Sequence, residues 1–303
     1  MAIHYWQNYS TVHGTRNFGD DINPFLLSKL FSREIIDGDD VCIVGIGTIL
    51  NERNFQQVDK YERKIVFSSG AGYESIEREF DDSWFISCVR GPKTAAYLKA
   101  SPDLAVTDGA ALLSDFYTAL PASRKEGVTF VPHVNTTWRL GGILKQFCDD
   151  LGINYVTPDL PFDLFVDEIN RSAVVLAEAM HGAILADALR TPWVACELMV
   201  HNRFKWEDWC ASLGVKYDPV NLGPAPEGSG FESLSSLPRG VRNRVRKLQL
   251  KARLKKLSLT ALPQLSEDAV LESKKQALRD IVAEINAQHA TASPRHRSDS
   301  HAP

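Results

Sequence analysis

The chain has 303 residues, of which 44% are hydrophobic, so it is long enough for two domains and can bury a core. Its formal net charge of −4 gives no overall case for nucleic acid as a partner. Five widely spaced cysteines without a CxxC pair argue against a disulfide framework and against a structural zinc site. The N-terminus does not resemble a signal peptide, and no apolar run approaches the length of a membrane span. We therefore expect a cytoplasmic globular protein without a bound metal.

Polar side chains follow the first predicted strand, residues 3–6. The segment after it predicts a helix that is capped by Asp21 or Asn23 and has a proline in its first turn. Asn17 and Asp20 lie just before this helix, at a crossing from strand to helix. Capping accounts for one of the two carboxylates. The other, Asp20, is a candidate to orient or deprotonate a hydroxyl, and Asn17 is a candidate substrate ligand.

An apolar run at residues 41–44 ends in the glycine-rich sequence Gly45-Ile46-Gly47-Thr48. This sequence resembles the first half of a dinucleotide fingerprint, but the third glycine is replaced by Leu50. We therefore expect no nicotinamide cofactor. Gly47 is instead a candidate position where a ligand or a neighbouring loop approaches the backbone closely.

Two more strands are predicted at residues 64–67 and 84–89, and the second leads directly into Arg90. A guanidinium at a strand end can bind a carboxylate or phosphate through two donors, although it could equally form an ion pair. Another very short strand is predicted before Asp108, and this residue lies at the tip of the glycine turn that follows the strand. It is a candidate binding residue, and a structural pairing with Arg90 is its alternative.

The composition turns polar near residues 120–127, and we place a domain boundary between residues 122 and 123. Strand and helix patterns then alternate again, which predicts a second doubly wound sheet. Its strands are expected at residues 128–132, 154–157, 172–176 and 193–196. His133 lies just beyond the first of these strands and is a candidate acid, base or ligand; a solvated loop histidine is the alternative.

Residues 178–189 follow an apolar strand and predict a tight turn and then a helix. In an open α/β sheet such a turn lies at the carboxyl end of a strand, where ligands bind, and the first helical turn attracts anions. His181 sits at this junction, and Gly182 beside it lets a ligand approach the backbone. His181 is the main candidate catalytic residue, with a buried turn histidine as the alternative.

Residues 201–209 interleave a histidine and two cations, Arg203 and Lys205, with aromatic side chains. This pattern predicts an anion pocket walled by indole rings. The alternative is an amphipathic helix whose aromatic side chains are partly buried.

The C-terminal part begins with a segment rich in Gly, Pro and Ser and continues as a basic helix at residues 239–257. One apolar stripe of this helix holds Val241, Val245, Leu248 and Ala252, and a second holds Leu250, Leu254 and Leu257. The helix either lies on an anionic membrane surface or packs its leucines on the domain. A last helix is expected at residues 267–288. The predicted units are residues 1–122, residues 123–220, a linker at 221–238, helices at 239–290 and a disordered tail at 291–303.

Five of these motifs, in their order and spacing, resemble the polysaccharide pyruvyltransferase family, above all its succinoglycan-type members in bacterial exopolysaccharide assembly. The resemblance covers residues 4–215 and leaves out the basic helix and the tail. The motifs are Asn17-Phe18-Gly19-Asp20-Asp21-Ile22-Asn23-Pro24, Gly45-Ile46-Gly47-Thr48, Val89-Arg90-Gly91-Pro92, Thr107-Asp108-Gly109-Ala110 and Glu178-Ala179-Met180-His181-Gly182-Ala183.

The resemblance implies two Rossmann-like domains facing a cleft, a GT-B-like fold, here with a C-terminal helical extension. It implies phosphoenolpyruvate as donor, a sugar of an exopolysaccharide or its lipid-linked precursor as acceptor, no further cofactor, and a pyruvate ketal and phosphate as products. The family's histidine matches His181 and its arginine matches Arg90. Many relatives carry an arginine where this chain has Ala179, so we expect Arg203 and Lys205 to replace it.

Two other functions fit the same observations. A GT-B glycosyltransferase that uses a nucleotide sugar would have the same two-domain cleft. A non-catalytic scaffold of polysaccharide assembly would use the basic helix as its functional part, on the inner face of the membrane. We expect the pyruvyltransferase, with His181, His133 and Asp20 in catalysis and with Asn17, Gly47, Arg90, Asp108, Gly182, Arg203 and Lys205 in substrate binding.

Overall fold

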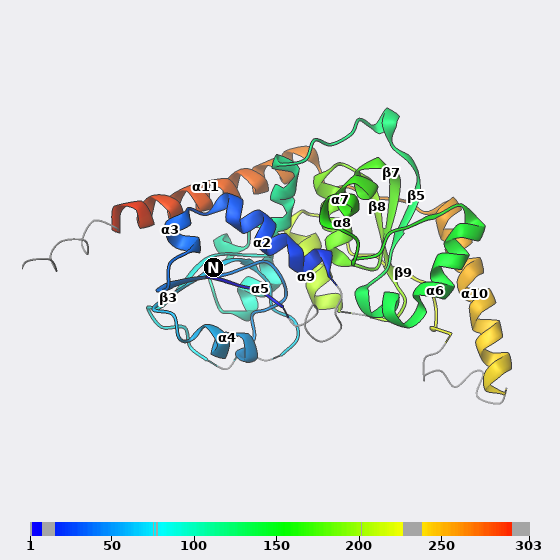
Figure 1. Ribbon diagram of the computed structural model, residues 1–303, viewed down its shortest axis with the longest axis horizontal. Helices are drawn as coiled ribbons and strands as arrows, with labels where there is room; N and C mark the ends of the chain where they lie inside the picture. Colours follow the sequence, from blue (N-terminus) through cyan, green and yellow to red (C-terminus); the bar gives the residue numbers. More distant parts are fainter. Residues whose placement is uncertain are drawn as a thin grey trace, which may run out of the picture.

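The computed structural model describes residues 2–7, 16–74, 76, 78–200, 202–226 and 238–292. Within these ranges the chain forms two parallel sheets that lie side by side, with helices packed around both (Figure 1). The predicted α/β class is therefore confirmed.

The first sheet has four parallel strands in the order β1-β2-β3-β4. Its strands are β1 (Ile3–His4), β2 (Val41–Val44), β3 (Arg63–Ser69) and β4 (Trp84–Val89). The segments between and after them form α2 (Phe18–Leu30), α3 (Arg33–Ile36), α4 (Glu52–Val58), α5 (Pro92–Tyr97) and the short 3₁₀ turns η1 (Pro102–Leu104), η2 (Gly109–Asp115) and η3 (Ala122–Arg124). The strands are apolar along most of their length because helices or turns cover both faces of a parallel sheet.

The second sheet has five parallel strands in the order β6-β5-β7-β8-β9. Its strands are β5 (Glu126–Val131), β6 (Asn154–Tyr155), β7 (Ser172–Ala177), β8 (Trp193–Glu197) and β9 (Val220–Asn221), and its helices are α6 (Val134–Leu151), α7 (Phe162–Arg171), α8 (Met180–Ala188) and α9 (Arg203–Ser212). The chain enters this sheet at β5, the second strand from one edge, goes outwards to β6 and then crosses to the other side of β5 for β7. Strand order therefore reverses between β5 and β7, the point where open α/β sheets bind ligands.

Helix α2 begins earlier than we expected, at Phe18 with Asn17 as its N-cap, so Pro24 lies inside the helix. Burial explains the difference, because the Phe18 ring stacks on Phe165 of α7 with the ring centres 4.0 Å apart. Pro24 has no N–H to donate to the carbonyl of Asp20. The Asn23 side-chain amide donates to that carbonyl instead, at 3.4 Å.

The last two helices pack on different sheets. Leu250, Leu254 and Leu257 of α10 (Arg239–Thr260) join a hydrophobic cluster of the second sheet, whereas α11 (Asp268–Ala292) contacts the first-sheet side through η2, α3 and β4. Figure 1 shows the two helices at opposite ends of the molecule. β9 lies where we expected the end of a domain and the start of a linker. Residues 227–237 of that linker and 293–303 of the predicted tail lie outside the described residues.

The helices of the described residues are too short or too polar to cross a lipid bilayer.

Candidate functional site

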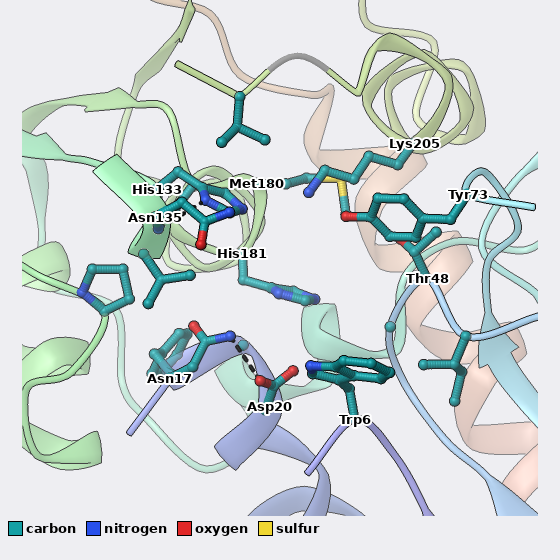
Figure 2. Close-up of a pocket in the computed structure, with 18 of the residues that line it drawn as sticks. Trp6, Asn17, Asp20, Thr48, Tyr73, His133, Asn135, Met180, His181 and Lys205 are labelled. Atoms are coloured by element: carbon teal, nitrogen blue, oxygen red, sulfur yellow. Dashed lines mark hydrogen bonds between the residues drawn. The ribbon is translucent and has the colours of Figure 1, made fainter. Parts of the chain in front are cut away.

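A cavity of about 540 Å³ lies at the carboxyl ends of strands from both sheets. Thr48 follows β2, Tyr73 follows β3, His133 follows β5 and His181 follows β7. Figure 2 places His181 in the middle of the cavity, between Asn17 and Asp20 on one side and His133 and Lys205 on the other. Seven of the ten predicted site residues line this cavity: Asn17, Asp20, Gly47, His133, His181, Gly182 and Lys205.

His181 lies in the first turn of α8, after the turn that leaves β7. The N-cap residue Ala179 makes no side-chain hydrogen bond, so no side chain caps this end of the helix. The imidazole packs against Gly19, where any Cβ would overlap Nδ1 of the ring. Burial, with smaller contributions from Lys205 and Arg90, lowers the pKa of His181 to about 3. His181 is therefore neutral at physiological pH.

Asp108 lies behind His181 and does not line the cavity. Its Oδ1 accepts a hydrogen bond from the Ala110 N–H at the start of η2. Its Oδ2 is 3.9 Å from His181 Nε2, and both atoms are buried without a hydrogen-bond partner among the described residues. Burial raises the pKa of Asp108 to about 6, so it is ionised at neutral pH. At this distance the carboxylate makes no hydrogen bond to the ring, but its charge lies close enough to stabilise a protonated imidazole.

His133 is held at the N-cap of α6 by Glu178, which sits at the end of β7. The carboxylate of Glu178 accepts hydrogen bonds from the His133 N–H at 2.9 Å, the Thr136 hydroxyl at 2.9 Å and the Met199 N–H at 2.9 Å. It thereby joins the ends of β5, β7 and β8. Burial, and to a lesser extent Lys205, lowers the pKa of His133 to about 3.

Asp20 lies on the first turn of α2, where it accepts a hydrogen bond from the Asn17 side-chain amide at 2.8 Å (Figure 2). Burial raises the pKa of Asp20 to about 7, and the nearby charge of Asp21 adds to this rise. The Asn17 hydrogen bond and the positive charge of Lys205 oppose it. Asp20 therefore carries a proton in a substantial fraction of molecules at neutral pH.

The two cations of the segment 201–209 point in different directions. Lys205 is only 9% exposed and lines the cavity, where its charge acts on Asp20 and both histidines. The Arg203 side chain is 62% exposed and pairs with Glu207 one turn along α9. Arg203 and Lys205 are two positions apart in α9, which rotates one side chain by about 200° relative to the other. They therefore face opposite sides of the helix. Of the two predicted substitutes for the missing arginine, the structure directs Lys205 into the cavity and Arg203 away from it.

Arg90 is fully buried behind the cavity wall. Its guanidinium donates to Asp208 at 3.1 Å, to the Thr48 hydroxyl at 2.9 Å and to the Ala71 carbonyl at 3.0 Å. Asp208 also accepts a hydrogen bond from the Thr94 N–H. These contacts use the donors that we expected to bind an anion. Arg90 therefore connects the Thr48 loop to α9, the helix that carries Lys205. Its ion pair is with Asp208, and not with Asp108 as in the alternative drawn from the sequence.

Sequence reasoning missed several residues of the site. Arg53 lines the cavity and lies over the Trp6 ring, with its guanidinium carbon 5.1 Å from the ring centre. Tyr73 and Asn135 also line the cavity, and Glu178 holds the backbone of the lining residue His133. The position of Arg53, five residues after the glycine-rich sequence that follows β2, was the only signal in the sequence. In the part of the chain that the structure describes, no three His, Cys, Asp or Glu side chains are grouped as a metal site requires.

No known family model matches the chain. The succinoglycan biosynthesis protein ExoV of Rhizobium meliloti (strain 1021) is 32% identical over 327 aligned residues, which cover 95% of this chain and 100% of that protein. Such identity over nearly the whole of both chains indicates common descent rather than a shared motif. Three of the five motifs that resemble the pyruvyltransferases supply 10 of the 24 residues that line the cavity. The chain therefore belongs to the polysaccharide pyruvyltransferase family, among its succinoglycan-type members.

Proposed function

We propose that this protein transfers the enolpyruvyl group of phosphoenolpyruvate to a sugar of an exopolysaccharide or of its lipid-linked precursor. The product is a pyruvate ketal that bridges two hydroxyls, and phosphate is released. One observation carries the proposal: two neutral histidines, a carboxyl group with a raised pKa and a buried lysine meet in one cavity of a chain from this family.

The donor carries a phosphate and a carboxylate, so its site needs positive charge and N–H donors. Lys205 supplies a buried cation, and the first turn of α8, which no side chain caps, supplies the positive end of a helix dipole. Arg53 adds a second cation on the cavity wall. We assign the donor to this side of the cavity. Arg90 then acts as a positioning residue that holds the Thr48 loop and α9.

Ketal formation moves two protons. One proton reaches the methylene carbon of the donor, which becomes a methyl group, while positive charge develops on the central carbon. Two acceptor hydroxyls bond to that carbon, the C–O bond to phosphate breaks, and the departing phosphate takes its bonding electrons. The two hydroxyls lose two protons, which balance the proton gained by the methyl group and the proton carried away by hydrogen phosphate.

We assign these proton transfers to Asp20 and His181. His181 is neutral and accepts a proton from an attacking hydroxyl. Burial makes the imidazole a weak base, and the carboxylate of Asp108, 3.9 Å from Nε2, offsets this by stabilising the imidazolium that forms. Protonated Asp20 delivers the proton to the methylene carbon, because its raised pKa keeps that proton available near neutral pH. His133 assists on the opposite wall.

The acceptor occupies the remainder of the cavity, between two GT-B-like Rossmann domains built on the two sheets. Residues 1–122 and 123–220 form these domains in our proposal. We place the reaction in the cytoplasm, where five unpaired buried cysteines are stable. No cofactor beyond the donor is required by this chemistry.

The test measures phosphate release from phosphoenolpyruvate by the purified protein, with and without a saccharide acceptor extracted from a strain that lacks the enzyme. The expected result is acceptor-dependent phosphate release together with a pyruvate ketal on the product, detected by mass spectrometry and NMR. Transfer of sugar from a nucleotide sugar without use of phosphoenolpyruvate would replace this proposal with a glycosyltransferase.

A further inference from the structure

Helix α10 has two opposite apolar faces, and only one is covered. Leu250, Leu254 and Leu257 are at most 5% exposed and pack on the second sheet. At 3.6 residues per turn, Val241, Leu248, Ala252 and Leu259 lie within about 40° of one another, on the side opposite these leucines. Val241 is 48% exposed, Leu248 65% and Leu259 74%, and Leu262 just beyond the helix is 92% exposed. We call this stripe of Val241, Leu248, Ala252 and Leu259 the outer face of α10.

Cations flank the outer face on both sides. The 22 residues of α10 contain nine Lys or Arg and no Asp or Glu. Arg244 and Lys255 border the outer face on one side and Lys256 on the other, and all three side chains are exposed. An ion pair with Asp150 engages Lys251, but none is found for Arg244, Lys255 or Lys256 among the described residues. Figure 1 shows α10 at one end of the molecule, at the edge of the second sheet.

We propose that the outer face of α10 docks on a membrane surface that contains anionic phospholipids. Its apolar side chains enter the boundary between headgroups and acyl chains, and the flanking cations contact lipid phosphates. The inner leucines meanwhile keep α10 attached to the second sheet. This inference goes beyond the proposed reaction and does not depend on it.

The apolar stripe distinguishes a membrane from nucleic acid as the occupant. Phosphate backbones are bound by cations and hydrogen-bond donors, which gain nothing from a stripe of exposed apolar side chains between them. A lipid surface offers both an anionic layer and an apolar layer at the depth that a helix lying in the interface reaches. The absence of acidic residues from α10 fits both a membrane and nucleic acid as the anionic partner. The exposed apolar side chains therefore decide in favour of the membrane.

The experiment is co-sedimentation of the full chain with vesicles of equal parts phosphatidylglycerol and phosphatidylcholine, and with vesicles of phosphatidylcholine alone. We expect binding to the anionic vesicles that weakens as salt is added. The double variant Lys255→Gln/Lys256→Gln should bind about thirtyfold more weakly, from about fivefold for each cation near the headgroups. Leu248→Ser should weaken binding about tenfold through lost apolar burial.

Matched controls come from exposed positions elsewhere. Lys60→Gln/Lys99→Gln removes two exposed lysines of the first half, and Leu164→Ser removes a leucine that is 51% exposed on α7. Both should bind vesicles like the wild type, and all variants should keep the wild-type melting temperature.

Equal binding to both vesicle types would overturn the proposal, as would Leu248→Ser or the α10 lysine variant binding no worse than its control. Tight binding to duplex DNA or RNA without vesicle binding would assign the face to nucleic acid instead. Phosphate release with a soluble acceptor is independent of every one of these outcomes.

Discussion

The cavity and the outer face of α10 both gather charged side chains, but they do so in opposite ways. In the cavity, the titratable side chains are few and largely buried, and single partners position them: Glu178 accepts from the backbone N–H of His133, and the Asn17 amide donates to Asp20. On α10, cations are numerous and exposed, with no acid in the helix. Burial changes the pKa values of His181, His133 and Asp20, so each group there acts through its own position. Exposed cations on α10 attract a partner through their total charge, and salt screens that attraction.

The largest effect should come from His181→Ala. In the cavity each side chain has its own role, and we assign a proton transfer of the reaction to His181. We expect turnover in the phosphate-release assay to fall about 10²- to 10⁴-fold, as for the loss of a general acid or base. Calorimetry should find the dissociation constant of phosphoenolpyruvate little changed.

Two variants set the scale for that loss. His289→Ala on α11 should leave turnover unchanged, since His289 lies outside the cavity. Asp108→Asn should lower turnover about 10- to 100-fold, because no carboxylate then lies 3.9 Å from Nε2 to stabilise the imidazolium, and it should leave donor binding intact. Near-normal turnover of His181→Ala would remove His181 from catalysis.

Arg90→Gln should have the next largest effect, on stability rather than on binding. The variant leaves the buried carboxylate of Asp208 without its cation, which lowers the free energy of unfolding by about 3–5 kcal/mol. Urea unfolding followed by tryptophan fluorescence measures this change. Arg203→Gln removes an exposed ion pair and should change stability by less than about 1 kcal/mol. Equal stability of the two variants would contradict the role of Arg90 as a buried connector.

Lys205→Gln and Arg203→Gln compare two cations on the same helix. We expect Lys205→Gln to weaken phosphoenolpyruvate binding about 10- to 100-fold, because a charge-assisted hydrogen bond in a buried site is lost. Arg203→Gln should bind the donor like the wild type. The opposite order would place the donor on the outer side of α9.

The smallest effect should be a pH-dependent gain in stability for Asp20→Asn. Because burial raises the pKa of Asp20 to about 7, the folded chain holds this proton more tightly than the unfolded chain does. Stability of the wild type therefore falls as pH rises from about 4 towards 7. The variant lacks the carboxylate, so it should exceed the wild type by about 2 kcal/mol at pH 8, after allowance for partial exposure of the group, and match it near pH 4.

Thermal unfolding of both proteins across this pH range measures the difference. A constant difference at all pH values would show that Asp20 titrates normally in the folded protein. Turnover of the wild type should also decline above about pH 7, as Asp20 loses the proton that we assign to the methylene carbon.

Local patterns in the sequence were enough to find the centre of the cavity. The strand, turn and helix around His181 lie within one continuous segment, and the same holds for His133. Both positions follow from the rule that ligands meet the carboxyl ends of parallel strands. The four strands of the first sheet and β5 to β8 of the second were found in the same way, from short local strand patterns.

Contacts between distant residues decided the rest. The partner of Arg90, Asp208, is 118 residues further along the chain, so no local pattern could show that the guanidinium is occupied. The start of α2 depends on Phe18 stacking against Phe165, which is equally remote. The basic helix carried two apolar stripes of similar length, and only the tertiary structure determines that Leu250 faces inwards and Leu248 outwards.

We propose that the cavity binds phosphoenolpyruvate through Lys205. Isothermal titration calorimetry of the wild type, Lys205→Gln and Arg203→Gln with phosphoenolpyruvate tests it most directly, with nucleotide sugars as parallel titrants. We predict saturable binding of phosphoenolpyruvate that is weakened in Lys205→Gln and retained in Arg203→Gln. Binding of a nucleotide sugar alone, or donor binding that is unaffected by Lys205→Gln, would contradict the account.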